Sequence, residues 1–115
     1  LHVSDLIKSS NFYSEVLGLH QTCSYAGANF FAADSYHHHI AINTWLGNNI
    51  AKADSTLHGL DHFALNLKSE ENFEELLRQM KRMKIEVLTD DNNKINKKSF
   101  FILDPDKIKI QIYCQ

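Results

Sequence analysis

The sequence predicts an α+β fold of two βαβββ repeats that form a concave half-barrel cavity. First, segments 30–43 and 100–113 overlay without a gap, so that Phe-Phe falls on Phe-Phe and Asp34 on Asp104. Second, a short alternating strand and an amphipathic helix precede each copy. Third, the last strand of each copy alternates isoleucine with other residues, as expected for a strand with one buried face. An internal repeat of this kind determines the whole architecture.

The bulk composition is that of one globular domain. The chain has 115 residues, of which 43% are hydrophobic and 23% are charged. We expect one domain over 1–115, with a first module at 1–45, a linker at 46–57 and a second module at 58–115. The net charge of −2 gives no general attraction to nucleic acid or to an anionic membrane. The sequence has no apolar run of the roughly 18 residues that a membrane span needs.

The two cysteines, Cys23 and Cys114, have neither metal-site nor redox-motif spacing. We therefore expect free thiols in a reducing compartment, which indicates a cytoplasmic protein.

The first copy begins with the end of a strand at 1–4, and Asp5 follows as a helix N-cap. Apolar residues recur at helical spacing over 12–17, and Gly18 supplies the C-terminal stop. Strands are expected near 20–25, 28–33 and 38–45, with Ala26 and Gly27 in a hairpin turn.

The second copy begins with a strand at 60–67, followed by a helix that Ser69 caps. The buried stripe of that helix is predicted to be Phe73, Leu76, Leu77 and Met80. Strands are expected at 86–88, 99–103 and 107–114, with an exposed loop at 90–94. The carboxylates of the Asp104-Pro105-Asp106 turn are expected to accept local backbone N–H groups.

Strand alternation assigns the faces of both sheets. Isoleucines such as Ile110 and Ile112 cover the helices, and His62 and Gln111 point to the opposite face. That second face is rich in histidine, which indicates a surface that holds a small-molecule ligand. The other candidate residues for lining it are His2, His37, His39, Asn43 and Tyr113. His38 falls on the helix side by the same alternation.

Two segments resemble a known superfamily. Val-Ser-Asp-Leu-x-x-Ser-x-x-Phe-Tyr-x-x-Val-Leu-Gly-Leu at 3–19 and Leu-Asp-Pro-Asp at 103–106 resemble the glyoxalase/bleomycin-resistance/extradiol-dioxygenase group, the vicinal oxygen chelate superfamily. Segment 36–45 is similar to the first half of bacterial catechol 2,3-dioxygenase-like proteins. In two-domain dioxygenases of this group that half usually lacks the iron.

The resemblance implies where a divalent metal ion (Zn, Mn, Fe or Ni) would bind. In metal-using members the ligands come from the first and last strands of each repeat. Those positions fall upstream of Leu1 and on Ala41, His62 and Gln111. Alanine cannot coordinate, and an amide binds hard cations less well than the usual glutamate. The resemblance also implies a homodimer.

Two functions remain open at this stage. The first is a divalent-metal-dependent lyase or oxygenase that acts on a small molecule with vicinal oxygens, with His62 and Gln111 as ligands. The second is a metal-free protein that sequesters a small molecule, as bleomycin-resistance members do. In the second case His62 is a hydrogen-bonded neutral histidine and Gln111 is a polar wall of the cavity. His37 and His39 are either further ligands or solvated residues at a strand entrance, and no catalytic residue is assigned.

Overall fold

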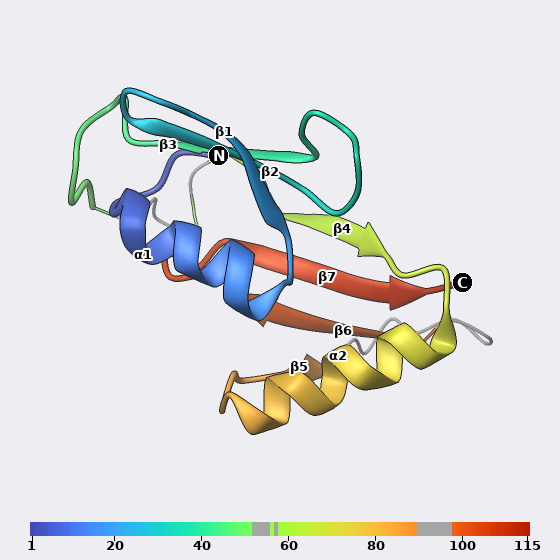
Figure 1. Cartoon of the computed structure of the whole chain (residues 1–115). Coiled ribbons are helices and arrows are strands. Elements are labelled where there is room, and N and C mark those ends of the chain that lie inside the picture. The colour runs from blue at the N-terminus through green and yellow to red at the C-terminus, as the bar shows by residue number, and fades with distance from the viewer. Residues whose placement is uncertain (52–55, 57, 90–97) are drawn as a thin grey trace. The chain divides into compact units, whose positions relative to one another are not determined.

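The computed structural model describes residues 1–51, 56, 58–89 and 98–115. The chain divides into two compact units, Leu1–Ser55 and Thr56–Gln115, coloured blue to green and green to red in Figure 1. Residues 52–55 and 57 of the predicted linker, and the whole predicted loop at 90–94, lie outside the described residues. No helix within the described part of the chain is long and apolar enough to cross a membrane.

Unit 1 contains a short helix and a three-stranded antiparallel sheet. Helix α1 (Leu6–Asn11) is capped by Asp5, whose carboxylate accepts a hydrogen bond from the Lys8 backbone amide at 3.0 Å. The strands are β1 (His20–Tyr25), β2 (Ala28–Ala32) and β3 (Ile40–Asn43), in the order β1-β2-β3. His2 forms an isolated parallel bridge with Asn43, which places the N-terminal segment beside β3.

The helix of unit 1 changes its geometry halfway along. After α1 the chain continues as a π-helix, η1 (Phe12–Val16), before Gly18 ends it at a φ of +70°. The wider turns of a π-helix rotate the following side chains relative to α-helical spacing. Phe12, Tyr13 and Val16 are nevertheless all buried, as the sequence predicts. The positive φ explains why glycine occupies the stop position.

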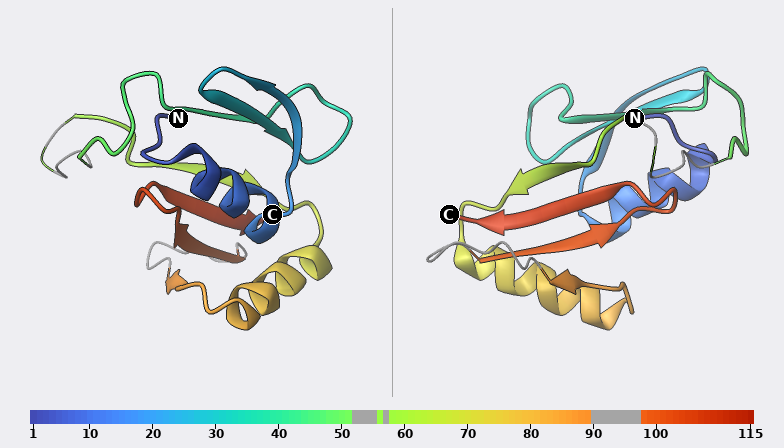
Figure 2. Two further views of the ribbon diagram at one scale, coloured as in Figure 1. Left: turned by 60° about the vertical axis from the view of Figure 1, so that its left-hand side comes forward. Right: turned by 180° about the vertical axis from the view of Figure 1, so that it is seen from behind.

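Unit 2 has a mixed four-stranded sheet with one long helix. The strands are β4 (His62–Asn66), β5 (Leu88–Thr89), β6 (Lys98–Leu103) and β7 (Lys109–Cys114), in the order β4-β7-β6-β5. Strand β4 pairs parallel to β7, and the other pairs are antiparallel. Helix α2 (Glu70–Arg82) runs along one face of this sheet, as two further views in Figure 2 show.

Two polar side chains of unit 2 hold the start of α2 and the turn between β6 and β7. The Ser69 hydroxyl accepts from the Asn72 amide at 3.3 Å and caps α2. The buried carboxylate of Asp104 accepts from the backbone amides of Asp106 and Ile108, both at 2.8 Å. Both contacts agree with the sequence-based expectation. Asp104 therefore holds the turn that returns β6 into β7.

The two units repeat one topology. In unit 2 the last strand lies between the first strand, parallel, and the third, antiparallel. In unit 1 the last strand β3 lies between the N-terminal segment, parallel, and β2, antiparallel. The isoleucines of both last strands are buried: Ile42, Ile110 and Ile112 are fully buried, and Ile40 is nearly so. The α+β fold with two such repeats is therefore confirmed, and so is the register predicted for the last strands.

The gapless overlay of the two repeats is wrong by one residue at the third strand. Phe31 pairs with Ile40 and is buried, whereas in unit 2 Phe100 is the buried ring and pairs with Ile112. The half-buried rings are Phe30 and Phe101. With Ile40 matched to Ile110, Phe31 is equivalent to Ile102, and Phe30 is equivalent to Phe101. The cause is the connection to the last strand, whose length differs by one residue between the two units.

Several strand ends differ from the predicted ones. The strand predicted at 38–45 spans only Ile40–Asn43, and that predicted at 60–67 spans His62–Asn66. The strand predicted at 86–88 is shifted to Leu88–Thr89, and the last strand starts two residues later, at Lys109. Strand alternation cannot be used to assign faces to residues that fall outside the observed strands, which include the histidines described below.

Candidate functional site

The face of unit 2 opposite α2 carries His62 and Gln111. His62 begins β4 and pairs with Lys109, and Ala64 pairs with Gln111 two residues farther along the same parallel ladder. Paired residues in a ladder point to one side, so all four residues share that face. Phe101 of β6 pairs with Gln111 and joins them. We call this set of residues, with Lys109 and His62 at one end, the Phe101 face.

Asp61 determines the orientation of the His62 ring. Its Oδ2 atom lies 2.6 Å from Nδ1 of His62, and the His62 side chain is 36% exposed. This hydrogen bond, together with the nearby Lys109 ammonium, holds the pKa of the Asp61 carboxyl below its usual value. An ionised carboxylate only accepts, so Nδ1 of His62 carries a proton and donates it. The lone pair of a neutral His62 ring is then on Nε2, away from Asp61.

Lys109 and His62 flank the Phe101 ring. The ring centroids of His62 and Phe101 are 5.4 Å apart with an interplanar angle of 88°, an edge-to-face contact. The Lys109 ammonium lies 5.4 Å from the Phe101 centroid, within the range of a cation–π contact. The same ammonium lies 3.8 Å from Oδ1 of Asp61. The corner thus combines an aromatic wall, an imidazole and a cation.

These residues do not fit a resident divalent cation within unit 2. His62 is a strong ligand, but Gln111 offers only a neutral carbonyl, and the strand partner of His62 is a lysine. Hard divalent cations need anionic oxygens, and a neighbouring ammonium opposes them. Over the described ranges of the chain, no group of three or more His, Cys, Asp and Glu side chains is arranged to hold a metal ion.

His2 and Asn43 are neighbours in unit 1. Their backbone bridge places both side chains on one side of the sheet, as their predicted parity requires. Both ring nitrogens of His2 are buried and have no hydrogen-bond partner in the described part of the chain. Asn43 Oδ1 accepts from the Trp45 amide at 3.3 Å, a local structural role. A role in ligand binding for these two residues remains a prediction, as it does for Tyr113 on β7.

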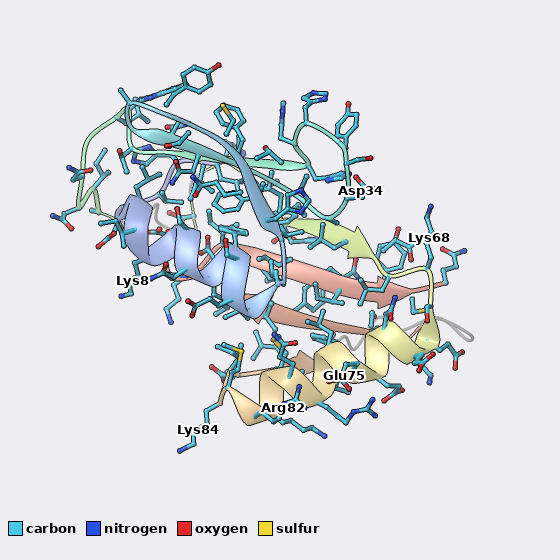
Figure 3. All side chains as sticks on the ribbon, viewed as in Figure 1. Lys8, Asp34, Lys68, Glu75, Arg82 and Lys84 are labelled. Carbon is cyan, nitrogen blue, oxygen red and sulfur yellow. The ribbon has the colours of Figure 1, made fainter. Side chains whose placement is uncertain are left out.

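The three consecutive histidines lie in the β2–β3 connection and not in a strand. His37 and His39 are exposed, and Nδ1 of His39 accepts from the Ala33 amide at 3.3 Å. His38 packs edge-on against Phe30 at 5.2 Å and lies 4.5 Å from the ring of His37. The predicted separation of His38 from His37 onto opposite faces is therefore wrong, because strand alternation does not apply outside the strand. Figure 3 labels Asp34 in the same connection.

A cavity of about 420 Å³ lies on the other side of the second sheet, between α2 and the β5 and β6 strands. Its walls include Phe73, Leu77 and Phe100, with Lys98 among the lining residues. The Lys98 ammonium contacts Glu74 at 2.9 Å and is already neutralised. None of the residues predicted from the sequence to bind a ligand lines this cavity.

The sequence-based reasoning did not assign a role to Asp61, Lys109 or Phe101. Lys109 is two residues before Gln111, so strand alternation predicts the same face for both side chains. Asp61 immediately precedes His62, and a carboxylate next to a candidate ligand is a signal that could have been recognised. Phe101 was hidden by the overlay error, which matched it with the buried Phe31.

Comparisons with known proteins agree with this fold. The family model described as "Glyoxalase/Bleomycin resistance protein/Dioxygenase superfamily" matches residues 1–112. The chain is 35% identical over 107 residues to a catechol-2,3-dioxygenase of Bacillus subtilis (strain 168), with 91% of this chain but only 35% of that protein covered. The chain therefore spans about a third of the length of that relative.

Solved structures show the same fold at low sequence identity. A glyoxalase/dioxygenase from Nostoc punctiforme has a TM-score of 0.81 at 20% identity, covering 100% of this chain and 86% of that one. The lactoylglutathione lyase from Agrobacterium tumefaciens has a TM-score of 0.76 at 18% identity, covering 99% and 88%. The fosfomycin resistance protein FosX from Listeria monocytogenes has 0.72 at 20%, covering 100% and 88%. This chain belongs to the glyoxalase/bleomycin resistance protein/dioxygenase superfamily.

Proposed function

We propose that this chain binds a small organic molecule directly on the Phe101 face, without a resident metal ion. The observation that carries the proposal is the charge beside His62. Lys109 is its strand partner, and Gln111 replaces the carboxylate that a metal-using member of the superfamily would place there. An imidazole, an amide and an ammonium next to an aromatic ring can contact a polar aromatic or carbonyl compound through hydrogen bonds and stacking.

The direct test uses the full chain and catechol, the compound named in the relative, as the probe. We expect calorimetric titration to give the same catechol affinity in chelator as after addition of Zn²⁺, Mn²⁺ or Fe²⁺. Gln111→Leu should weaken it, because the ligand loses a polar contact on the face. Binding that appears only after metal is added would contradict the proposal.

A second candidate function is a divalent-metal-dependent lyase or oxygenase. It is favoured by the Asp61–His62 hydrogen bond, because metal-binding histidines usually donate their other nitrogen to a carboxylate. The name of the relative, catechol-2,3-dioxygenase, points the same way. His62 and Gln111 would hold the ion, and the ion would supply Lewis-acid chemistry. The remaining ligands would have to come from outside this set.

Metal titrations separate the two candidates. For the metal-dependent enzyme, His62→Ala should remove most of the affinity for Fe²⁺, and Gln111→Glu should strengthen it by restoring a carboxylate. For the metal-free protein, neither substitution should change Zn²⁺, Mn²⁺ or Fe²⁺ binding. His38→Ala is a matched control, because it removes an imidazole that packs against Phe30 in the other unit.

We also propose that the two modules form one ligand-binding domain and that the chain acts as a cytoplasmic homodimer. Support for the dimer comes from strand β1, which is exposed along its whole length at the edge of the first sheet. Free sheet edges are common sites of pairing with another chain. Sedimentation that gives a strict monomer at micromolar concentration would contradict the dimer.

A further inference from the structure

We infer that the ligand of the Phe101 face is a small organic anion whose charged oxygen binds Lys109 and whose apolar part lies on the Phe101 ring. The inference depends on the proposed function and narrows it to a ligand class. Its basis is the combination of a cation and an aromatic wall at one corner, with the edge of the His62 ring beside them.

The ammonium of Lys109 has hydrogen-bonding capacity to spare. Its contact with Asp61 Oδ1 is 3.8 Å long, beyond hydrogen-bonding distance, and the Asp61 side chain is 78% exposed. The other oxygen of Asp61 accepts from His62 at 2.6 Å. A long, solvent-screened ion pair contributes little, so a ligand carboxylate can approach Lys109 to about 2.8 Å and form a stronger, charge-assisted bond.

The position of Lys109 is held by its own packing. Its side chain is 39% exposed, and its ammonium lies over the Phe101 ring. A lysine that rests on an aromatic ring loses less freedom on binding an anion than one extending into water. The ring also gives an aromatic or aliphatic ligand body an apolar surface next to the charge.

The orientation of His62 adds a second contact, a hydrogen-bond acceptor beside the Lys109 donor. With Nδ1 occupied by Asp61, the ring presents Nε2 to a ligand. Nε2 of the neutral ring accepts a hydrogen bond from a hydroxyl. A hydroxy-acid or phenol-acid ligand satisfies Lys109 through its carboxylate and His62 through its hydroxyl.

Benzoate and benzamide are suitable probes, because they share a ring and a shape but differ in charge. We expect the full chain in chelator to bind benzoate at least tenfold more tightly than benzamide, the effect of about one charge-assisted hydrogen bond. Lys109→Met keeps an unbranched side chain next to Phe101 but removes the charge, and should reduce benzoate affinity about tenfold while leaving benzamide affinity unchanged.

Lys68→Met is the matched control for the loss of one positive charge. Lys68 is exposed just after β4, at the opposite end of that strand from the Lys109 pair, and is labelled in Figure 3. It should leave benzoate affinity unchanged. Phe101→Leu should weaken both probes equally, because it removes the shared aromatic wall and not the charge.

The possible failures are distinguishable. Equal binding of benzoate and benzamide, or equal losses in the Lys109 and Lys68 variants, would overturn the charge inference and leave the proposed function in place. Catechol binding without benzoate binding would do the same. If catechol, benzoate and benzamide all fail to bind the chelator-treated protein, the proposed function fails, and the inference fails with it.

Discussion

The loss of stability on replacing each of the four phenylalanines of the two Phe-Phe pairs by alanine should depend on its burial and not on its place in the pair. Phe31 is 0% exposed and Phe100 is 4% exposed, whereas Phe30 and Phe101 are half-buried on the other face. Replacing a fully buried phenylalanine by alanine costs about 3–5 kcal/mol, through lost burial and the cavity left behind. Replacing a half-buried ring should cost about 1 kcal/mol.

Variants that lose these amounts of stability should still be folded in the absence of denaturant. A chain of this length is expected to have a free energy of unfolding of about 6–17 kcal/mol. Urea denaturation followed by far-UV circular dichroism should therefore give Phe31→Ala and Phe100→Ala large losses of midpoint. Phe30→Ala and Phe101→Ala should give small ones. The paired design compares adjacent residues of one type in the same strand.

The more costly phenylalanine should have a different place in the pair in β2 than in β6, as the one-residue shift requires. The second phenylalanine of the pair should be the costly one in β2, and the first should be the costly one in β6. If the costly residue has the same place in both pairs, the gapless overlay would be right and the register derived from the structure would be wrong.

Three further predictions concern capping, the closing turn and pH. Ser69→Ala should lower the free energy of unfolding by about 1 kcal/mol, measured by urea denaturation, because the N-cap acceptor of α2 is lost; Ser69→Asp should restore it, and failure to do so would argue against a capping role. Asp104→Ala should cost about 2–3 kcal/mol in the same assay, because two backbone amides at 2.8 Å lose a buried, charged acceptor; a neutral effect would show that water replaces it. The Arg78 and Arg82 guanidiniums hold the pKa of Glu75 below its ordinary value of 4.5, so the stability that Glu75 contributes is complete above that pH and is lost as the pH falls below it. Denaturation as a function of pH should therefore show a shallower loss of stability in acid for Glu75→Gln. An unchanged slope would show that this ion pair does not contribute to stability.

Figure 3 places Glu75 and Arg82 on the exposed side of α2. Their side chains are 50% and 64% exposed, so solvent screens the pair and its effect on stability is small. The sign of the pH effect, and not its size, is therefore the quantity that the Glu75→Gln experiment tests.

The sequence by itself determined the local features of the chain. Asp5 and Ser69 cap helices as their side-chain chemistry requires, and Gly18 adopts the positive φ that ends the first helical segment. Alternation within a strand is a property of the backbone alone, so the faces of Ile110 and Gln111 could be assigned in advance. The family motifs gave the order of the elements.

Only the tertiary structure decided which residues meet across strands. Cross-strand register depends on the length of each connection, and the β2–β3 connection is one residue longer than its counterpart. The second phenylalanine of the pair is therefore the buried one in β2, and the first is the buried one in β6. The three histidines of the β2–β3 connection lie outside the strand, so strand alternation does not predict which face their side chains occupy. The approach of Asp61, Lys109 and Phe101 to His62 joins residues from three strands and a preceding turn. The sequence places Asp61 next to His62, but it does not encode the approach of Lys109 and Phe101. That approach arises because β7 lies between β4 and β6 in the sheet.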